Sequence, residues 1–246
     1  MFVMKFIERE NEILKTIKSM MDTGLDFVVV GGYAVSALAR HRFSVDCDIV
    51  VPKKKLDDFG DFLGKDGFWK HIVKAGFDEI YGGEFMRYKK EVSKLPIAID
   101  LLIGSLVCRA TRASWSFEYV KNHSTTANVP GTESSISCRI PEKELLIAFK
   151  IHSARRADVR DVVMLRENAD LEKVLIHLRR GNIEALKDQI KKIDIALEDK
   201  NLVDSLKGVF TLTADVKKQI GNARKDLETI SRKLNKLDAS MNDAEK

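Results

Sequence analysis

Apolar residues along the chain follow two different periods, and the period changes near Pro141. Before Pro141, short apolar runs end at glycine or proline, which is typical of β-strands. Predicted strands lie at 27–30, 44–51, 85–90 and 95–103, with one more short strand in the turn-rich segment 130–140. Helical spacing predicts helices at 6–22, 33–40 and 55–75. This mixture predicts an α+β fold in which helices flank a small mixed sheet.

The rest of the chain has helical periodicity throughout. Residues 142–165 form the strongest predicted helix, with Pro141 beside its first turn. From Leu202 to Met241, apolar residues alternate in steps of four and three for almost six heptads, the seam pattern of a coiled coil. We expect this tail to form one long helix or a helical hairpin, packed within the chain, against a second copy or against a partner protein. Three parts are therefore predicted, at 1–140, 141–200 and 201–246.

Composition indicates a soluble globular protein, because 44% of the 246 residues are hydrophobic and 32% are charged. No apolar run approaches the roughly 20 residues that span a bilayer, so no membrane partner is expected. The net charge of +5 suits a phosphate-bearing partner but is too mild to identify one. The three cysteines lack C-x-x-C spacing and the five histidines lack zinc-ligand spacing. Reduced thiols and a cytoplasmic location are the expectation.

The strongest chemical signal is a pair of aspartates, Asp46 and Asp48, in the predicted strand 44–51. Positions i and i+2 of a strand face the same side, so both carboxylates project together from an otherwise apolar strand. Two unpaired carboxylates side by side repel each other and are costly to bury. A divalent cation is the usual remedy, and Mg²⁺ takes oxygen ligands of this kind together with substrate phosphates.

A third carboxylate, Asp100, lies in the middle of the predicted strand 95–103, where an unpaired aspartate would be anomalous. Two carboxylates from one strand and one from its neighbour are able to hold two Mg²⁺ ions about 4 Å apart, the arrangement used for in-line displacement at phosphorus. Gly31 and Gly32 come just before a predicted helix. Backbone at such a glycine turn is able to approach a phosphate closely, next to the positive end of the helix dipole.

These residues resemble the motifs of the polymerase-beta-type nucleotidyltransferase superfamily. The resemblance rests on Gly31-Gly32, thirteen intervening residues, Asp46-Cys47-Asp48 and a later Asp100, and it covers about residues 25–105. Within that superfamily the chain looks most like stand-alone bacterial and archaeal enzymes. These include the nucleotidyltransferase toxins of abortive-infection (type IV) toxin–antitoxin systems and the small antibiotic nucleotidyltransferases. Segment 145–161 is similar to the first helix after the catalytic domain of the toxin-like enzymes.

The resemblance implies a palm-like catalytic domain that transfers an NMP from an NTP such as ATP to a hydroxyl acceptor, with release of pyrophosphate. The acceptor would be a protein, an RNA end or a small molecule. Asp46, Asp48 and Asp100 would bind two Mg²⁺ ions, with Mn²⁺ as an alternative, and Asp100 would be a candidate base for the acceptor hydroxyl. The nucleotide-binding residues implied by the resemblance are Gly31, Gly32, Ser44, Lys150 and Arg155.

Simpler interpretations stay open. Lys150 is also consistent with a solvated helix face, and Arg42 with a solvated loop. The charged residues after Lys150 are consistent with surface ion pairs at i,i+3 and i,i+4 spacing: Arg155, Arg156, Asp158 and Asp161. The whole protein could instead be a catalytically inactive nucleotide-binding scaffold, a nucleic-acid-binding module or a dimerisation adaptor acting through its tail. The sequence identifies neither the acceptor nor the preferred base.

Overall fold

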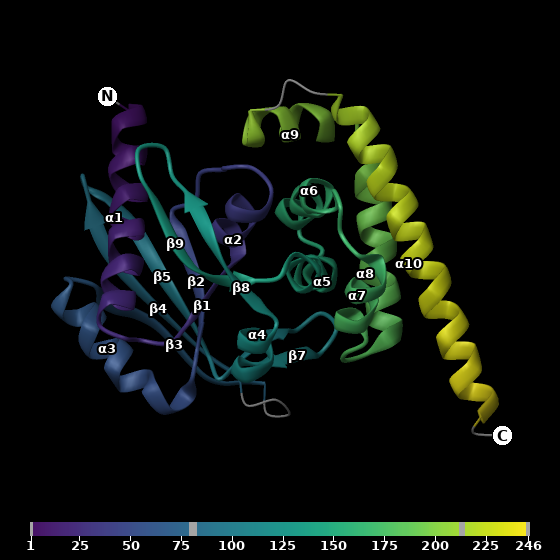
Figure 1. Ribbon diagram of the computed structural model, residues 1–246, viewed down its shortest axis with the longest axis horizontal. Helices are drawn as coiled ribbons and strands as arrows, with labels where there is room; N and C mark the ends of the chain where they lie inside the picture. The colour runs from purple at the N-terminus through teal and green to yellow at the C-terminus, as the bar shows by residue number, and fades with distance from the viewer. Residues whose placement is uncertain (1, 79–82, 212–214, 245–246) are drawn as a thin grey trace. The chain divides into compact units, whose positions relative to one another are not determined.

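The computed structural model of the protein describes residues 2–78, 83–211 and 215–244 (Figure 1). The chain divides into two compact units. The first comprises Met1–Val107 and Ser114–Glu142, and the second comprises Cys108–Ala113 and Lys143–Lys246. A mixed sheet with flanking helices builds the first unit, and helices dominate the second. The predicted α+β class with a helical C-terminal part is therefore confirmed.

The first unit is organised around a five-stranded sheet with the strand order β1-β2-β5-β4-β3. The β2–β5 pair is parallel and the other pairs are antiparallel, so the sheet is mixed as predicted. The strands are β1 (Val28–Val30), β2 (Asp46–Val51), β3 (Trp69–Asp78), β4 (Gly83–Val92) and β5 (Leu95–Ile103). Strand β1 and the second half of β2 are fully buried, which explains their short, purely apolar sequences.

Helices and two short strand pairs complete the first unit. Helix α1 (Phe2–Asp22) contacts β4, β5 and β9 (Figure 1) and buries a stripe formed by Ile13, Leu14, Ile17 and Met20. The other helical elements are α2 (Gly31–Leu38), the 3₁₀ turn η1 (Lys53–Lys55), α3 (Leu56–Lys65) and α4 (Phe117–Asn122). The strand pairs are β6 (Ser105–Cys108) with β7 (Ala113–Ser116), and β8 (Ser124–Pro130) with β9 (Ser135–Pro141).

The predicted helix at 55–75 is wrong in its second half. Helix α3 ends at Lys65, and strand β3 begins at Trp69. Gly67 has a left-handed φ of 85°, which turns the chain out of the helix. From Trp69 onward the backbone pairs with β4. Strand pairing therefore overrides the helical spacing of this segment.

The second unit contains helices α5 (Lys143–Ser153), α6 (Arg156–Leu165), α7 (Leu171–Leu178), α8 (Ile183–Leu197), α9 (Leu202–Phe210) and α10 (Val216–Ala244). The predicted single helix at 142–165 is wrong, because the chain leaves the helix between α5 and α6. Ala154 has a left-handed φ of 45° there. The Asp158 carboxylate accepts a hydrogen bond from the Arg155 N–H at 3.2 Å, which caps the start of α6.

A buried histidine fixes the end of α5. The ring of His152 is fully buried, with Nδ1 2.7 Å from Thr111 Oγ1 and Nε2 3.1 Å from the carbonyl oxygen of Leu178. A carbonyl only accepts hydrogen bonds, so we infer that Nε2 donates and that Nδ1 accepts from the Thr111 hydroxyl. Burial lowers the pKa of His152 to about 4, which keeps the ring neutral near pH 7. The neutral ring ties α5 to α7 and to segment 108–113.

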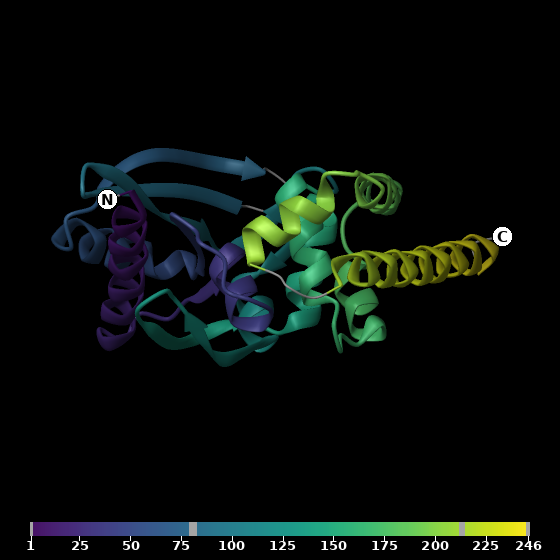
Figure 2. The same cartoon turned by 90° about the horizontal axis from the view of Figure 1, so that it is seen from above.

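The predicted heptad tail forms two helices, so of the two predicted alternatives the single long helix is wrong. Helix α9 is capped by Thr211, whose φ of 49° is left-handed, whereas α10 is continuous (Figure 2). The α10 seam packs against other helices of the same unit and buries Val216, Ala223, Leu227, Ile230 and Leu234. Thr213 and the side chains of Leu237 and Met241 lie outside the described residues. Among the helices in the described part of the chain, none has both the length and the apolar content needed to cross a membrane.

Candidate functional site

The three predicted carboxylates lie on two adjacent strands of the first unit. Strand β2 alternates, with Cys47 buried on one face and Asp46 and Asp48 partly exposed on the other. The parallel β2–β5 register places Asp100 directly beside Asp48. Asp100 differs from the other two in being only 3% exposed. The sequence prediction that these residues come together is therefore matched by the geometry, and metal binding by them stays a prediction.

Gly31 begins α2 in direct contact with the cluster. Its φ is 64°, and a Cβ added there would lie 2.2 Å from Asp48 Oδ2. The antiparallel β1–β2 register brings the chain to this position, because Val30 pairs with Asp48. Only glycine fits both the left-handed backbone and the approach of the carboxylate. The Asp48 carboxylate consequently rests at the N-terminus of α2, where the helix dipole favours negative charge.

Gly32 faces a second group of polar side chains. A Cβ at Gly32 would meet Arg42 Nη2 at 3.1 Å and Ser44 Oγ at 3.2 Å. The Ser44 hydroxyl donates to the Asp46 carbonyl at 2.9 Å, which connects this group to β2. A solvated loop was one open interpretation of Arg42, and the structure places its guanidinium over the glycine turn. Arg42 thus supplies hydrogen-bond donors next to the start of α2, whereas the one Ser44 O–H group already donates to Asp46.

The loop between α2 and β2 is held in place by two buried side chains of α2. The Tyr33 hydroxyl donates to the Ser44 carbonyl at 2.9 Å. Ser36 Oγ donates to the Arg42 carbonyl at 3.2 Å and accepts from the Arg42 N–H at 3.1 Å. Burial raises the pKa of Tyr33 well above its ordinary value, so the phenol keeps the proton that it donates. The helix that starts at the glycine turn therefore positions Arg42 and Ser44.

Two arginines that sequence analysis missed lie beside the carboxylates. Arg87 on β4 donates to both oxygens of Asp100, from Nε at 2.7 Å and from Nη2 at 2.5 Å, and its Nη2 lies 3.8 Å from Asp46 Oδ2. Arg9 on α1 is 7% exposed and donates to the Pro96 carbonyl. Burial lowers the pKa of Arg9, and the charge of Asp46 opposes that change.

Arg87 and Asp100 stabilise each other's charged forms. Hydrogen bonding to Asp100 is the main cause that raises the pKa of Arg87. Burial raises the pKa of Asp100, and the hydrogen bonds from Arg87 oppose this shift. The pair is a bidentate ion pair, the strongest geometry for an arginine and a carboxylate.

The donor set fits a hard divalent cation. Three carboxylates offer oxygen ligands of the type that Mg²⁺ and Mn²⁺ prefer. The Asp46 side chain is 47% exposed, so an ion is able to reach the cluster from solvent. Asp46, Asp48 and Asp100 are therefore candidate ligands on one strand pair, with the glycine turn beside them. Binding of phosphate at that turn stays a prediction.

Lys150 and Arg155 belong to a separate ion-pair network in the second unit. The Lys150 ammonium lies 3.0 Å from Asp158 and 2.8 Å from Asp161, and the residue is 5% exposed. The alternative of a solvated lysine is therefore wrong. Arg155 pairs with Asp158 at 2.8 Å, which matches the predicted i,i+3 spacing, but only the Arg155 side chain is exposed. Asp158 and Asp161 are buried, so the prediction that both belong to surface ion pairs is wrong. Binding of phosphate by Lys150 or Arg155 stays a prediction.

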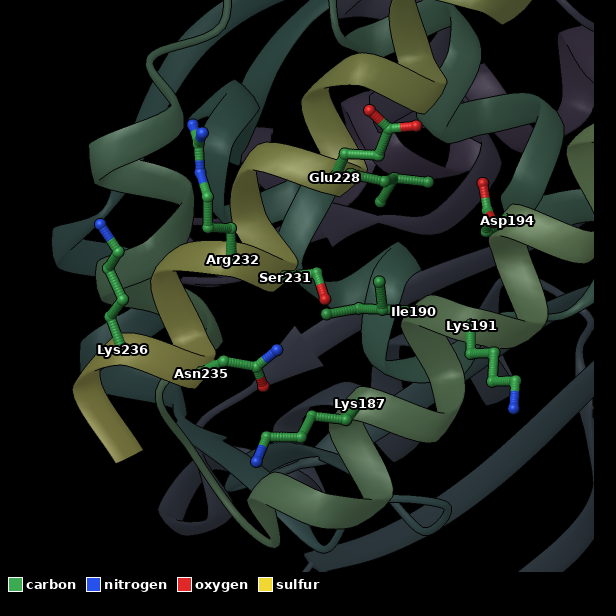
Figure 3. A pocket seen from close by; sticks show the side chains of 10 residues that line it. Lys187, Ile190, Lys191, Asp194, Glu228, Ser231, Arg232, Asn235 and Lys236 are labelled. Atoms are coloured by element: carbon green, nitrogen blue, oxygen red, sulfur yellow. The ribbon is translucent and has the colours of Figure 1, made fainter. Parts of the chain in front are cut away.

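A groove of about 780 Å³ runs between α8 and α10 of the second unit (Figure 3). Its lining is rich in basic side chains, with Lys187, Lys191, Arg232 and Lys236 among them. None of the predicted site residues lines it. The groove is therefore not formed by the predicted site residues.

No family model matches the chain, and no curated protein matches it. A proposed nucleotidyltransferase from H. pylori is 20% identical, with 94% of this chain and 97% of that chain covered and a TM-score of 0.49. The lincosamide antibiotic adenylyltransferase LnuA, bound to lincomycin, is 17% identical, with 65% and 98% covered and a TM-score of 0.44.

A further solved structure is ANT(2")-Ia in complex with adenylyl-2"-tobramycin. It is 15% identical, with 72% of this chain and 95% of that chain covered and a TM-score of 0.47. These three solved structures are a proposed nucleotidyltransferase, an adenylyltransferase and a protein bound to an adenylylated antibiotic. At these identities and TM-scores they assign neither a family nor an activity to this chain.

Proposed function

We propose that this protein is a metal-dependent nucleotidyltransferase that moves an NMP from an NTP to a hydroxyl acceptor. The observation that supports it is the convergence of Asp46, Asp48 and Asp100 beside the turn at Gly31. Only glycine fits at that position of the turn. Carboxylates for metal and backbone for phosphate are the two parts that phosphoryl-type transfer needs most, because its catalysis is mainly positioning and charge neutralisation. The motif resemblance in residues 25–105 points to the same chemistry.

In this proposal the three carboxylates would hold Mg²⁺, and the bound ion would supply positive charge beside the phosphates and lower the pKa of the acceptor hydroxyl. The triphosphate lies at Gly31-Gly32, where backbone N–H groups at the start of α2 donate to it. Arg42 adds donors beside Gly32, and Ser44 would donate there by exchanging its hydrogen bond to the Asp46 carbonyl for one to the phosphate. Positive charge at Arg42 stabilises the triphosphate more strongly than a neutral donor would.

The proposed reaction is a single displacement at the α-phosphorus. The acceptor oxygen forms a bond to that phosphorus, and the bond to the oxygen bridging the α- and β-phosphates breaks. Pyrophosphate leaves with the bonding electrons, and the acceptor hydroxyl gives its proton to a carboxylate of the cluster. Asp100 is the predicted base, because burial raises its pKa and the hydrogen bonds from Arg87 only oppose that shift. Partly exposed Asp46 is a second candidate for this role.

The finer assignments form part of the proposal. They are membership of the toxin-like branch, use of two metal ions, and phosphate contacts from Lys150 and Arg155. Lys150 is held by two carboxylates, so a role in phosphate binding requires that network to open.

The test is transfer of label from each α-labelled NTP in the presence of Mg²⁺ and a cell extract from the source organism. We expect label in one class of acceptor, pyrophosphate release, and loss of both with EDTA. Asp48→Asn should lower the rate at least about 100-fold, because it removes a charge from the cluster. Asp188→Asn is the matched control, since this exposed aspartate on α8 lies in the second unit.

Absence of transfer with every nucleotide would contradict the proposal. Nucleotide binding without transfer would then favour a catalytically inactive nucleotide-binding scaffold. Binding of DNA or RNA that weakens steeply with salt and survives Asp46→Ala would favour a nucleic-acid-binding module.

A further inference from the structure

The Arg87 guanidinium occupies the position that a cation bound between the carboxylates would take. Its Nη2 atom lies 2.5 Å from Asp100 Oδ2 and 3.8 Å from Asp46 Oδ2, and its Nε lies 2.7 Å from Asp100 Oδ1. Both oxygens of the buried Asp100 therefore already accept charge-assisted hydrogen bonds. The guanidinium supplies the positive charge that makes burial of Asp100 tolerable.

A divalent ion and Arg87 compete for the same oxygens. Each positive charge stabilises the carboxylates, but the two repel each other when both lie within a few ångströms of Asp100. Arg87 does not escape this repulsion by losing a proton, because an arginine guanidinium stays charged in proteins. The side chain must instead move, and because 29% of its surface is exposed it is able to move towards solvent.

We propose that Arg87 is a positioning residue that occupies the carboxylate cluster as a resident counter-cation and is displaced from Asp100 when the metal binds. This inference rests on the proposed function, because it takes the cluster to be the metal site. It adds that the free protein holds Asp100 ionised and in place through Arg87, at the expense of metal affinity. A displaced guanidinium beside the glycine turn is also a suitable donor for the triphosphate, so metal and nucleotide would bind more tightly together than separately.

The test measures Mn²⁺ binding to the full chain without nucleotide, by the EPR signal of free Mn²⁺. Arg87→Gln removes the competing charge and should bind Mn²⁺ at least about tenfold more tightly than the wild type. Lys53→Gln is the charge control. Lys53, like Arg87, pairs with a carboxylate of the sheet, but its partner is Glu84 on β4 and the Lys53 side chain is exposed. Its Mn²⁺ affinity should stay within about twofold of the wild type.

Arg87→Gln leaves the buried Asp100 without its partner. If this variant does not fold for that reason, Arg87→Lys provides the second test. Lysine keeps the charge but loses the bidentate fork, so Mn²⁺ affinity should rise about threefold. Equal or weaker Mn²⁺ binding by both variants overturns the inference while leaving the metal site intact. If wild type and both variants bind no Mn²⁺ at millimolar concentration, the inference and the metal-dependent proposal fail together.

Discussion

Replacement of Gly31 by alanine tests whether the glycine turn positions the metal-binding carboxylates. The added Cβ would lie 2.2 Å from Asp48 Oδ2, whereas ordinary contact begins at 3.4 Å, so about 1.2 Å of movement is required. The left-handed φ of 64° adds about 1–2 kcal/mol of backbone strain. Asp48 is the side chain that gives way, since turning it off its rotamer costs only about 1 kcal/mol.

We expect Gly31→Ala to have a moderate effect on the free energy of unfolding and a large effect on transfer activity. Gly31→Ala should lower the free energy of unfolding by about 2–3 kcal/mol, a loss that most domains survive. A carboxylate displaced by about 1 Å should lower transfer activity about 100-fold, and Mn²⁺ affinity should fall as well. Unfolding in urea, Mn²⁺ titration and label transfer measure the three quantities.

Gly24→Ala is the matched control. Gly24 has a similar left-handed φ of 78°, and a Cβ there would have no neighbour within 4 Å. It should therefore lose about 1–2 kcal/mol through backbone strain alone and keep full metal affinity and activity. If both variants lose the same stability and Gly31→Ala binds Mn²⁺ like the wild type, the contact between Gly31 and Asp48 does not position the site.

Two further predictions concern the second unit. Because burial lowers the pKa of His152 to about 4, its contribution to stability is present above the unfolded pKa of 6.5 and is lost as pH falls towards 4. Urea unfolding at pH 7 and 4.5 should show the wild type losing about 2–3 kcal/mol more than His152→Gln, and parallel losses would refute neutral burial. Lys150→Met should lower the free energy of unfolding by about 3–5 kcal/mol, because Asp158 and Asp161 lose their buried partner. An unchanged unfolding midpoint, with transfer activity lost, would instead favour a phosphate-binding lysine.

The carboxylate cluster was predictable because its signals are local. Asp46 and Asp48 share a face through strand alternation alone, and the apolar residues around them exclude an ordinary surface strand. Asp100 stands out for the same reason, as a charge inside an apolar strand. The parallel register that sets Asp100 beside Asp48 comes from the packing of the sheet and not from either strand.

The break between α5 and α6 was not predictable from local preference. Alanine is the strongest helix former, yet Ala154 adopts a left-handed φ of 45° and ends the helical run. The compensation is non-local, since the turn lets Asp158 and Asp161 reach Lys150. The burial of Lys150 was also not predictable from the sequence pattern. Lys150 was therefore predicted to be solvated or to bind phosphate, and not to belong to a buried ion-pair network.

Arg87 lies between these two cases, because its strand was predicted from the sequence whereas its register follows from the geometry of the turn. Ser93 and Lys94 both have left-handed φ values, which is the geometry of a two-residue hairpin turn. Val92 then pairs with Leu95, and counting outward from that pair sets Arg87 opposite Asp100. The turn length therefore decides which β4 residue meets the buried carboxylate. A one-residue change in this turn would shift the register, remove the guanidinium from Asp100 and leave the carboxylate without its counter-charge.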